Sequence, residues 1–229
     1  MNERAGTPVG RRLVLGMLGL GAAGVAVGSG LQKTVNRALA PISEFVPTGG
    51  GFRYYSVTSS VKRLNEQTYR LKVSGLVSKP TTFTMADLGV LPQTSLTKDF
   101  QCVTGWRVPD VAWSGVAMPD LLKACGADTS AAGLQITSFD GAYTESLTME
   151  QAMRADVLVA STMLGAPVTH DHGGPVRLFV APMYGYKSLK WLGGIEVVGK
   201  VRDGYWEVRG YDTDAWVGKS NGRDDAPTA

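Results

Sequence analysis

The chain has 229 residues, of which 44% are hydrophobic and 19% charged, a composition that excludes disorder as its main state. Its 29 glycines follow no Gly-X-Y period, so a collagen-like chain is also excluded and many tight turns are expected. A net charge of +3 can indicate a nucleic-acid partner. The first 40 residues alone carry +4, however, which leaves −1 for the rest of the chain. No nucleic-acid partner is therefore expected.

Residues 1–40 have the form of a twin-arginine export signal. Arg11 and Arg12 precede 20 uncharged residues, Leu13–Gln32, which are rich in Leu, Val, Ala and Gly. Twenty helical residues reach about 30 Å, which is also enough for an N-terminal membrane anchor. A small-residue cleavage pattern at residues 38–40 is followed by Pro41, so cleaved and anchored forms both remain open. We expect a periplasmic protein, or one held at the extracytoplasmic face of the membrane, and this export route favours a redox cofactor.

Residues 41–51 are interpreted as a linker, residues 52–218 as one folded domain and residues 219–229 as a polar tail. Short strands are predicted at residues 69–73, 134–139, 143–147, 157–160, 176–180 and 195–198, and short helices at residues 84–88, 118–125 and 148–153. Thr84 and Thr148 are the expected N-caps, and Gly126 is expected to end the second helix. These elements indicate an α+β domain with β-rich mixed sheets and short helices.

The two cysteines stand in different settings. Cys125 ends the apolar helix at residues 118–125, where a small buried thiol is expected. Cys102 lies in the polar segment Asp99–Arg107, which is interpreted as a glycine-bearing loop. From the residues alone the Cys102 thiol remains open to three roles, as a nucleophile, a metal ligand or half of a disulfide with Cys125.

A second group of polar residues runs over residues 170–190. In it, Arg177, Lys187 and Lys190 surround the hydroxyl of Ser188. Such a set can hold a phosphate through charge-assisted hydrogen bonds. An ordinary solvated basic loop fits the same pattern equally well.

The two histidines support no familiar catalytic or zinc motif. His170 and His172 are two residues apart and have no second cysteine nearby, so a four-ligand zinc site is not expected. A protease that pairs Cys102 with one of them is disfavoured, because no family-specific signature accompanies the pair.

Three segments resemble a known family in order and spacing. They are Phe100–Trp106 with Trp113–Val116, Asp171–Leu178 continuing through Tyr184–Leu192, and Gly204–Tyr211. Together they resemble the molybdopterin-binding domain of the sulfite oxidase-type molybdenum enzymes, a group that includes the bacterial methionine sulfoxide reductase catalytic subunits. The resemblance covers roughly residues 50–218. It implies the sulfite oxidase-type molybdopterin-binding fold and a molybdenum–molybdopterin cofactor, a pyranopterin dithiolene that brings two sulfur ligands of its own.

The resemblance also implies roles for individual residues. Cys102 would be the thiolate ligand of molybdenum, while Tyr143 and Arg107 match an active-site tyrosine and an anion-binding arginine of sulfite oxidases. The implied cofactor-binding residues are Tyr54, Tyr55, His172, Arg177, Ser188, Leu189 and Lys190, the last three at the pterin phosphate. Simple packing across a hairpin remains an alternative role for Tyr143.

The implied function is oxygen-atom transfer to or from a small-molecule or protein-bound oxo substrate. The Gly-Asn-Arg-Arg pattern that usually surrounds the anion-binding arginine is missing at Arg107, so reduction of a sulfoxide or N-oxide is favoured over sulfite oxidation by the same site. The length leaves no room for the haem and dimerisation domains of eukaryotic sulfite oxidases. We therefore expect a monomer that exchanges electrons with a separate electron-transfer protein, such as a membrane cytochrome b. A non-catalytic exported domain that retains the fold is the alternative.

Overall fold

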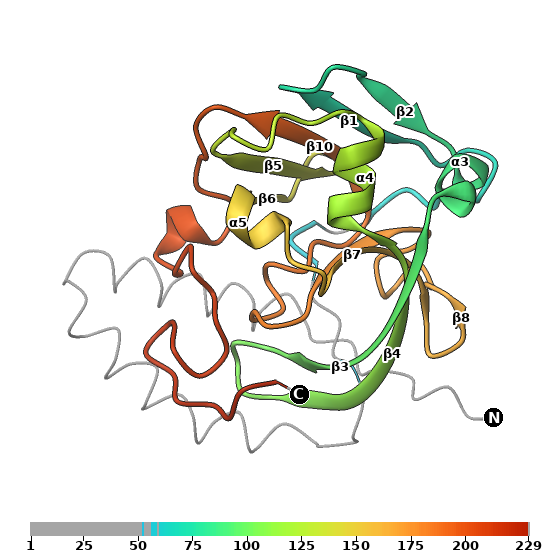
Figure 1. The fold of residues 1–229 in the computed structure, drawn as a ribbon. Helices are drawn as coiled ribbons and strands as arrows, with labels where there is room; N and C mark the ends of the chain where they lie inside the picture. The colour runs from blue at the N-terminus through green and yellow to red at the C-terminus, as the bar shows by residue number, and fades with distance from the viewer. Residues whose placement is uncertain (1–51, 53–55, 59, 229) are drawn as a thin grey trace.

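The computed structural model describes residue 52, residues 56–58 and residues 60–228. The predicted leader and linker, and also Tyr54 and Tyr55, lie outside the described residues and remain expectations. The described residues form two sheets that meet at a shared core, with short helices along their margins (Figure 1).

The first sheet is mixed. It contains β1 (Leu71–Gly75), β2 (Thr81–Phe83), β5 (Gly133–Ser138), β6 (Thr144–Thr148) and β10 (Leu192–Val198), in the order β2-β1-β10-β5-β6. β1 and β10 run parallel, and the other neighbours are antiparallel. Leu134, Ile136 and Leu147 of the β5–β6 hairpin are fully buried, and this burial fixes the register of the predicted hairpin.

The second sheet is antiparallel. It contains β3 (Gln93–Gln101), β4 (Arg107–Ala117), β7 (Val157–Met163), β8 (Ala166–Pro167) and β9 (Arg177–Val180), in the order β3-β4-β7-β8 with β9 also paired to β7. Figure 1 shows the long β3–β4 hairpin curving from the α3 end of the molecule to the opposite end. The predicted α+β class, with β-rich mixed sheets and short helices, is confirmed.

The predicted helices form where their caps were placed. They are α3 (Met85–Val90), α4 (Met118–Ala124) and α5 (Met149–Ala152), and a short 3-10 helix η1 (Glu207–Arg209) follows near the end of the chain. Thr84 and Thr148 each accept a hydrogen bond from the amide three residues on, and each of these later residues returns a side-chain bond. Gly126 has a φ of +59° and ends α4 as expected.

The prediction of a loop over Asp99–Arg107 is wrong at both ends. Asp99 to Gln101 close β3 and Arg107 opens β4, so the connecting turn is limited to residues 102–106. Polar side chains obscure β3 in the sequence, because its first six residues alternate between exposed and half-buried positions and only the last three are buried. The outer part of β3 is therefore held mainly by backbone pairing with β4.

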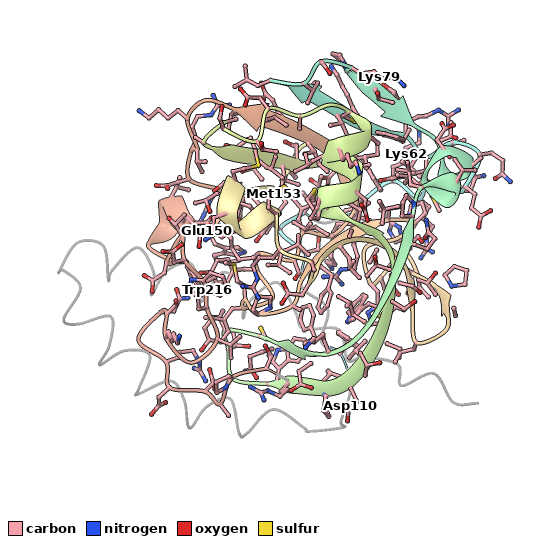
Figure 2. The ribbon with its side chains drawn as sticks, viewed as in Figure 1. Lys62, Lys79, Asp110, Glu150, Met153 and Trp216 are labelled. Carbon is pink, nitrogen blue, oxygen red and sulfur yellow. The ribbon has the colours of Figure 1, made fainter. Side chains whose placement is uncertain are left out.

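The core draws apolar side chains from both sheets, and the side chains in Figure 2 fill the space between them. Cys125 is completely buried in this core, as expected, and burial raises the pKa of its thiol. Neither cysteine is in a disulfide, which removes the Cys102–Cys125 bridge. Within the described ranges no helix has the length and apolarity needed to cross a membrane.

The polar tail packs on the domain. Ser220 and Asn221 are buried, and the hydroxyl of Thr228 donates to the carbonyl oxygen of Ala181 at 3.2 Å. Figure 1 shows the chain ending beside β3. Residues 219–228 are therefore part of the fold around the β3–β4 hairpin.

Candidate functional site

Cys102 begins the turn that joins β3 to β4. Its amide donates to the carbonyl oxygen of Trp106 at 2.9 Å, and the amide of Gly105 donates to the carbonyl oxygen of Cys102 at 3.0 Å. Gly105 has a φ of +98°, which glycine adopts without strain and which permits this tight turn. The half-buried thiol Sγ lies 3.2 Å from the hydroxyl of Thr104. The turn that positions the thiol is therefore formed by backbone hydrogen bonds.

Arg177, the first residue of β9, is a buried cation that ties two loops together. Its Nη1 and Nη2 donate to the carbonyl oxygens of His172 and Ser188, both at 2.8 Å. The guanidinium also lies over the rings of Phe100 and Trp113, at 5.4 and 5.3 Å from their centroids. The arginine therefore sets the spacing between the loop at His172 and the loop at Ser188.

The segment after β9 presents Ser188, Leu189 and Lys190. The hydroxyl of Ser188 accepts a hydrogen bond from the amide of Val180 at 3.0 Å, which pins the segment to the end of β9. Lys190 stays partly exposed, with its Nζ 4.2 Å from the centroid of the Trp191 ring. These contacts hold a hydroxyl and an ammonium group on one short stretch of chain.

One cavity of about 150 Å³ brings these groups together. The predicted site residues that line it are Cys102, Tyr143, His172, Arg177, Ser188, Leu189 and Lys190. Among the described residues, no group of three or more His, Cys, Asp or Glu side chains is arranged to hold a metal ion. The cavity therefore combines one thiol with a set of cationic and hydroxyl groups.

The electrostatics of the cavity favour an anionic ligand. Burial, with added repulsion from Arg177, lowers the pKa of Lys190 to about 7 and that of His172 to about 4. Burial also lowers the pKa of Arg177 to about 9, so its guanidinium remains charged at neutral pH. A bound anion would offset this crowding of positive charge.

Lys187 is not part of this cationic wall, which corrects one element of the predicted phosphate site. Its side chain is completely buried and pairs with Glu145 and Glu207. The alternative of a solvated basic loop is also wrong, because Arg177 and Ser188 are each only 3% exposed.

Tyr143 lines the cavity just before β6 and donates its hydroxyl to the carbonyl oxygen of Tyr186 at 2.7 Å. Burial, with the nearby carboxyl groups of Glu145 and Glu207, raises the pKa of its phenol well above 10. Its ring also stacks on Tyr205, with 5.3 Å between centroids. The phenol therefore stays protonated in the working pH range, and both predicted roles, packing and facing the site, are compatible with its position.

Arg107, like Lys187, is a predicted residue in the described part of the chain that does not line the cavity. Its Nε donates to Gln101 Oε1 at 2.6 Å, and its Nη1 pairs with Asp99 at 3.2 Å. The remaining donors reach the carbonyl oxygens of Ala226 and Pro227 in the C-terminal tail. In this arrangement the guanidinium holds the tail against the hairpin.

Aromatic side chains that carried no predicted role make up much of the cavity wall. They are Phe52, Phe100, Trp106, Tyr186, Trp191, Trp206 and Tyr211. Most of them lie within the three segments that carry the family resemblance, which was the available signal. Their flat faces suit a planar heterocycle and exclude water from it.

The pKa of Lys190 predicts a pH dependence of anion binding. Sulfate keeps its charge near neutrality, so its affinity for the cofactor-free protein should fall about tenfold between about pH 6 and pH 8.5, as Lys190 loses its proton. Titration calorimetry would measure the change. Lys190→Gln is the control and should bind sulfate with nearly constant affinity over this range. A flat profile in the unmodified protein would contradict the prediction.

Comparisons with known proteins identify the family of the chain. The sequence pattern of the "Oxidoreductase molybdopterin binding domain" matches residues 58–206. The putative protein-methionine-sulfoxide reductase subunit YedZ1 of Azospira oryzae is 31% identical over 74% of this chain and 63% of that protein. The sulfite oxidase of Arabidopsis thaliana is 28% identical over 63% of this chain and 46% of that protein.

Among solved structures, the sulfane dehydrogenase SoxCD of Paracoccus pantotrophus superposes with a TM-score of 0.57 at 28% identity, over 62% of this chain and 41% of that one. The chain thus spans 41% to 63% of the length of these three proteins. The match over residues 58–206 covers well over half of the chain. The chain therefore belongs to the oxidoreductase molybdopterin-binding domain family, as a sulfite oxidase-type oxidoreductase with a molybdenum–molybdopterin cofactor.

Proposed function

We propose that this protein is an exported oxidoreductase that catalyses oxygen-atom transfer, in the direction of reduction of a sulfoxide or N-oxide. One observation carries the proposal: the thiol of Cys102, the cationic side chains of Arg177 and Lys190 and the hydroxyl of Ser188 line the same cavity. A thiolate is a suitable soft ligand for the metal. Charge-assisted bonds suit the phosphate of the pterin.

The residues present fit the molybdopterin group. Arg177 is a buried cation whose hydrogen-bond partners, within the described chain, are backbone carbonyl oxygens rather than carboxylates. Its charge and the lowered pKa of Lys190 both favour an added anion at this place. Cys102 would hold the metal, and Ser188, Leu189 and Lys190 the phosphate. His172 and Arg177 would contact the pterin, as would Tyr54 and Tyr55.

When bound, the cofactor supplies a redox metal that exchanges an oxygen atom with the substrate and takes up or releases two electrons. The chain supplies the surroundings. The aromatic wall excludes water, Arg177 fixes the two loops at His172 and Ser188, and the phenol of Tyr143 stays protonated, with its hydroxyl donated to the Tyr186 carbonyl oxygen. The neutral phenol therefore lines the site without adding a negative charge beside the substrate.

Sulfite oxidation is the second candidate, supported by the similarity to a sulfite oxidase. An anionic substrate needs a cation beside the metal. Arg107, the predicted anion-binding residue, is instead engaged by Asp99, Gln101 and the tail carbonyl groups. This arrangement favours the neutral sulfoxide or N-oxide as substrate.

Electrons would come from a separate electron-transfer protein, such as a membrane cytochrome b. The 229 residues contain two cysteines and no Cys-x-x-Cys-His haem-attachment motif. The paired arginines at residues 11 and 12 support export by the twin-arginine route, with the leader either cleaved or kept as an anchor. The twin-arginine route carries proteins that are already folded, so the family's cofactor can be inserted before export.

Elemental analysis tests the proposal directly. Protein expressed with its leader intact should contain about one molybdenum per chain and release a fluorescent pterin on denaturation. Turnover with dimethyl sulfoxide, methionine sulfoxide and sulfite would then separate the two candidate reactions. A folded protein without molybdenum, whose Cys102 thiol reacts freely with an alkylating reagent, would instead indicate a non-catalytic domain that retains the fold.

A further inference from the structure

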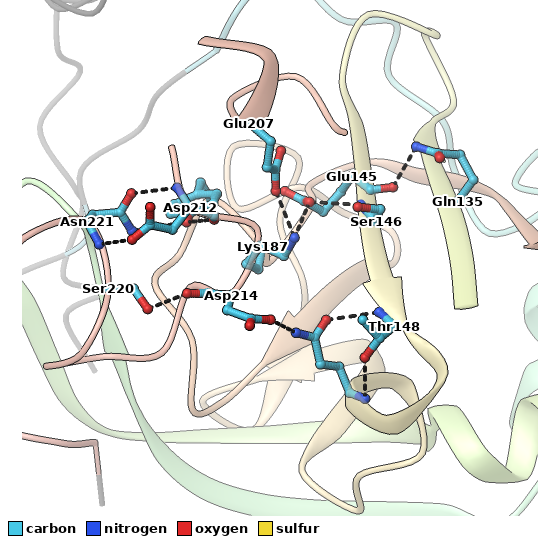
Figure 3. Close-up of polar contacts among 12 residues, drawn as sticks. Gln135, Glu145, Ser146, Thr148, Lys187, Glu207, Asp212, Asp214, Ser220 and Asn221 are labelled. Atoms are coloured by element: carbon cyan, nitrogen blue, oxygen red, sulfur yellow. Dashed lines mark hydrogen bonds and ion pairs between the residues drawn. The ribbon is translucent and has the colours of Figure 1, made fainter. Parts of the chain in front are cut away.

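Three buried ionisable side chains lie next in sequence to residues that line the cavity, and the proposed mechanism does not use them. Lys187 Nζ lies 2.6 Å from Glu145 Oε1 and 2.7 Å from Glu207 Oε1, and all three side chains are 0% or 1% exposed (Figure 3). Exposed ion pairs contribute little to stability, whereas a buried group of this kind must satisfy its charges internally. We call Glu145, Lys187 and Glu207 the buried triad.

The buried triad joins three separate parts of the chain. Glu145 lies on β6, Lys187 lies in the segment after β9, and Glu207 begins η1. Each member is also a near neighbour in sequence of residues that line the cavity. Tyr143 lies two residues before Glu145, and Tyr186 and Ser188 flank Lys187.

Glu207 of η1 also has a sequence neighbour that lines the cavity. Trp206, immediately before Glu207, lines the cavity. At Gly204 an added Cβ would lie 2.7 Å from Glu207 Oε2 and 2.8 Å from the carbonyl oxygen of Thr144. Glycine is therefore required for η1 to approach β6 this closely. The amide of Tyr205 completes the contact by donating to the Thr144 carbonyl oxygen at 2.8 Å.

The charges of the buried triad balance only with an extra proton. Burial raises the pKa of Glu145 well above its usual range, and the neighbouring Glu207 carboxyl adds to the rise against the opposing effect of Lys187. With Glu145 protonated, one ammonium faces one carboxylate and the group is neutral. A neutral group is compatible with complete burial, so it can serve as a rigid support.

We propose that Lys187 is a positioning residue for the cofactor, because its contacts with two carboxyl groups hold β6, the segment after β9 and η1 so that Tyr143, Ser188 and Trp206 face one bound group. The inference rests on the proposed function. Lys187 acts through these neighbours and touches neither substrate nor cofactor. Each contact supports a different wall of the cavity, which makes the two contacts separable by mutation.

Glu207→Leu is the informative variant. It cuts the link from Lys187 to η1 while Lys187 and Glu145 remain as a balanced pair, so the chain should still fold. Lys187→Met leaves two buried carboxyl groups without their cation and is the more severe change. Arg154→Gln removes an exposed ion pair with Asp156, away from the cavity, and is the control.

The test uses the molybdenum-loaded protein and two readouts besides turnover. Glu207→Leu should release its pterin about tenfold faster than the unmodified protein and shift the thiolate-to-metal absorption band, because a lost buried contact of this size changes affinity by about that factor. Arg154→Gln should match the unmodified protein in both. Wild-type release and an unshifted band in Glu207→Leu would overturn the positioning inference and leave the proposed function standing. Unmodified protein that holds no molybdenum would overturn both.

Discussion

Replacing Cys102 by alanine is expected to lower the proposed oxygen-atom-transfer activity at least about a thousandfold, equivalent to about 4 kcal/mol in the barrier, because the metal would lose its proposed protein ligand. The free energy of unfolding should change by less than about 1 kcal/mol. The hydrogen bonds that fix the turn at residues 102–106 come from the backbone, and alanine retains them. The contact between Sγ and the Thr104 hydroxyl is lost.

Cys125→Ser is the matched control and should show the opposite pattern. The Cys125 side chain is completely buried among apolar residues, so a hydroxyl there should cost about 1–3 kcal/mol of stability. Activity per folded molecule and molybdenum content should stay at the level of the unmodified protein. Chemical denaturation, elemental analysis and turnover measure the three quantities. Unchanged activity in Cys102→Ala, or loss of molybdenum in Cys125→Ser, would contradict the assignment of the two thiols.

The features that were predictable from the sequence are those with a local cause. Thr84 and Thr148 predict the starts of α3 and α5. In each capping box the threonine hydroxyl accepts from the amide three residues later, and the side chain of that later residue accepts from the threonine amide. Gly126 ends α4 for the same kind of reason. Alternating apolar residues placed β5, since Leu134 and Ile136 enter the core, and β6 was predicted as its hairpin partner.

The β3–β4 hairpin could not be recognised in this way. Its outer residues are polar because they face solvent, and its strength comes from pairing between two segments that the sequence does not show to be partners. The distinction between Lys187 and Lys190 was equally hidden. Both are lysines in one short segment. The carboxyl groups that pair with Lys187 belong to β6 and η1, which are 42 residues before it and 20 residues after it.

Arg107 illustrates the same limit for function. Its place five residues after Cys102 matched an anion-binding position, and that match depends only on the local sequence around the β3–β4 turn. The groups that engage its outer nitrogens come from Ala226 and Pro227, at the far end of the sequence. Only the folded arrangement shows that the tail competes for this guanidinium, so its role toward a substrate remains a prediction.

Arg177→Lys is expected to have the second large effect, although it keeps the positive charge. The planar guanidinium of Arg177 donates to three carbonyl oxygens, those of His172, Leu178 and Ser188, in three directions. An ammonium group is a point donor and cannot span the two loops. The cofactor-free protein should lose about 2–4 kcal/mol of stability, and its melting temperature should fall by about 5–15 °C.

The cofactor should also bind less well to Arg177→Lys, because the loops at His172 and Ser188 lose their common anchor. A ligand that binds only the folded state stabilises it more when its dissociation constant is lower, so molybdenum loading should raise the melting temperature of the unmodified protein more than that of the variant. Calorimetry of the loaded and cofactor-free forms of both proteins measures this difference. An equal rise in the two proteins would show that charge alone holds the cofactor, and that the fork of hydrogen bonds from Arg177 serves only the fold.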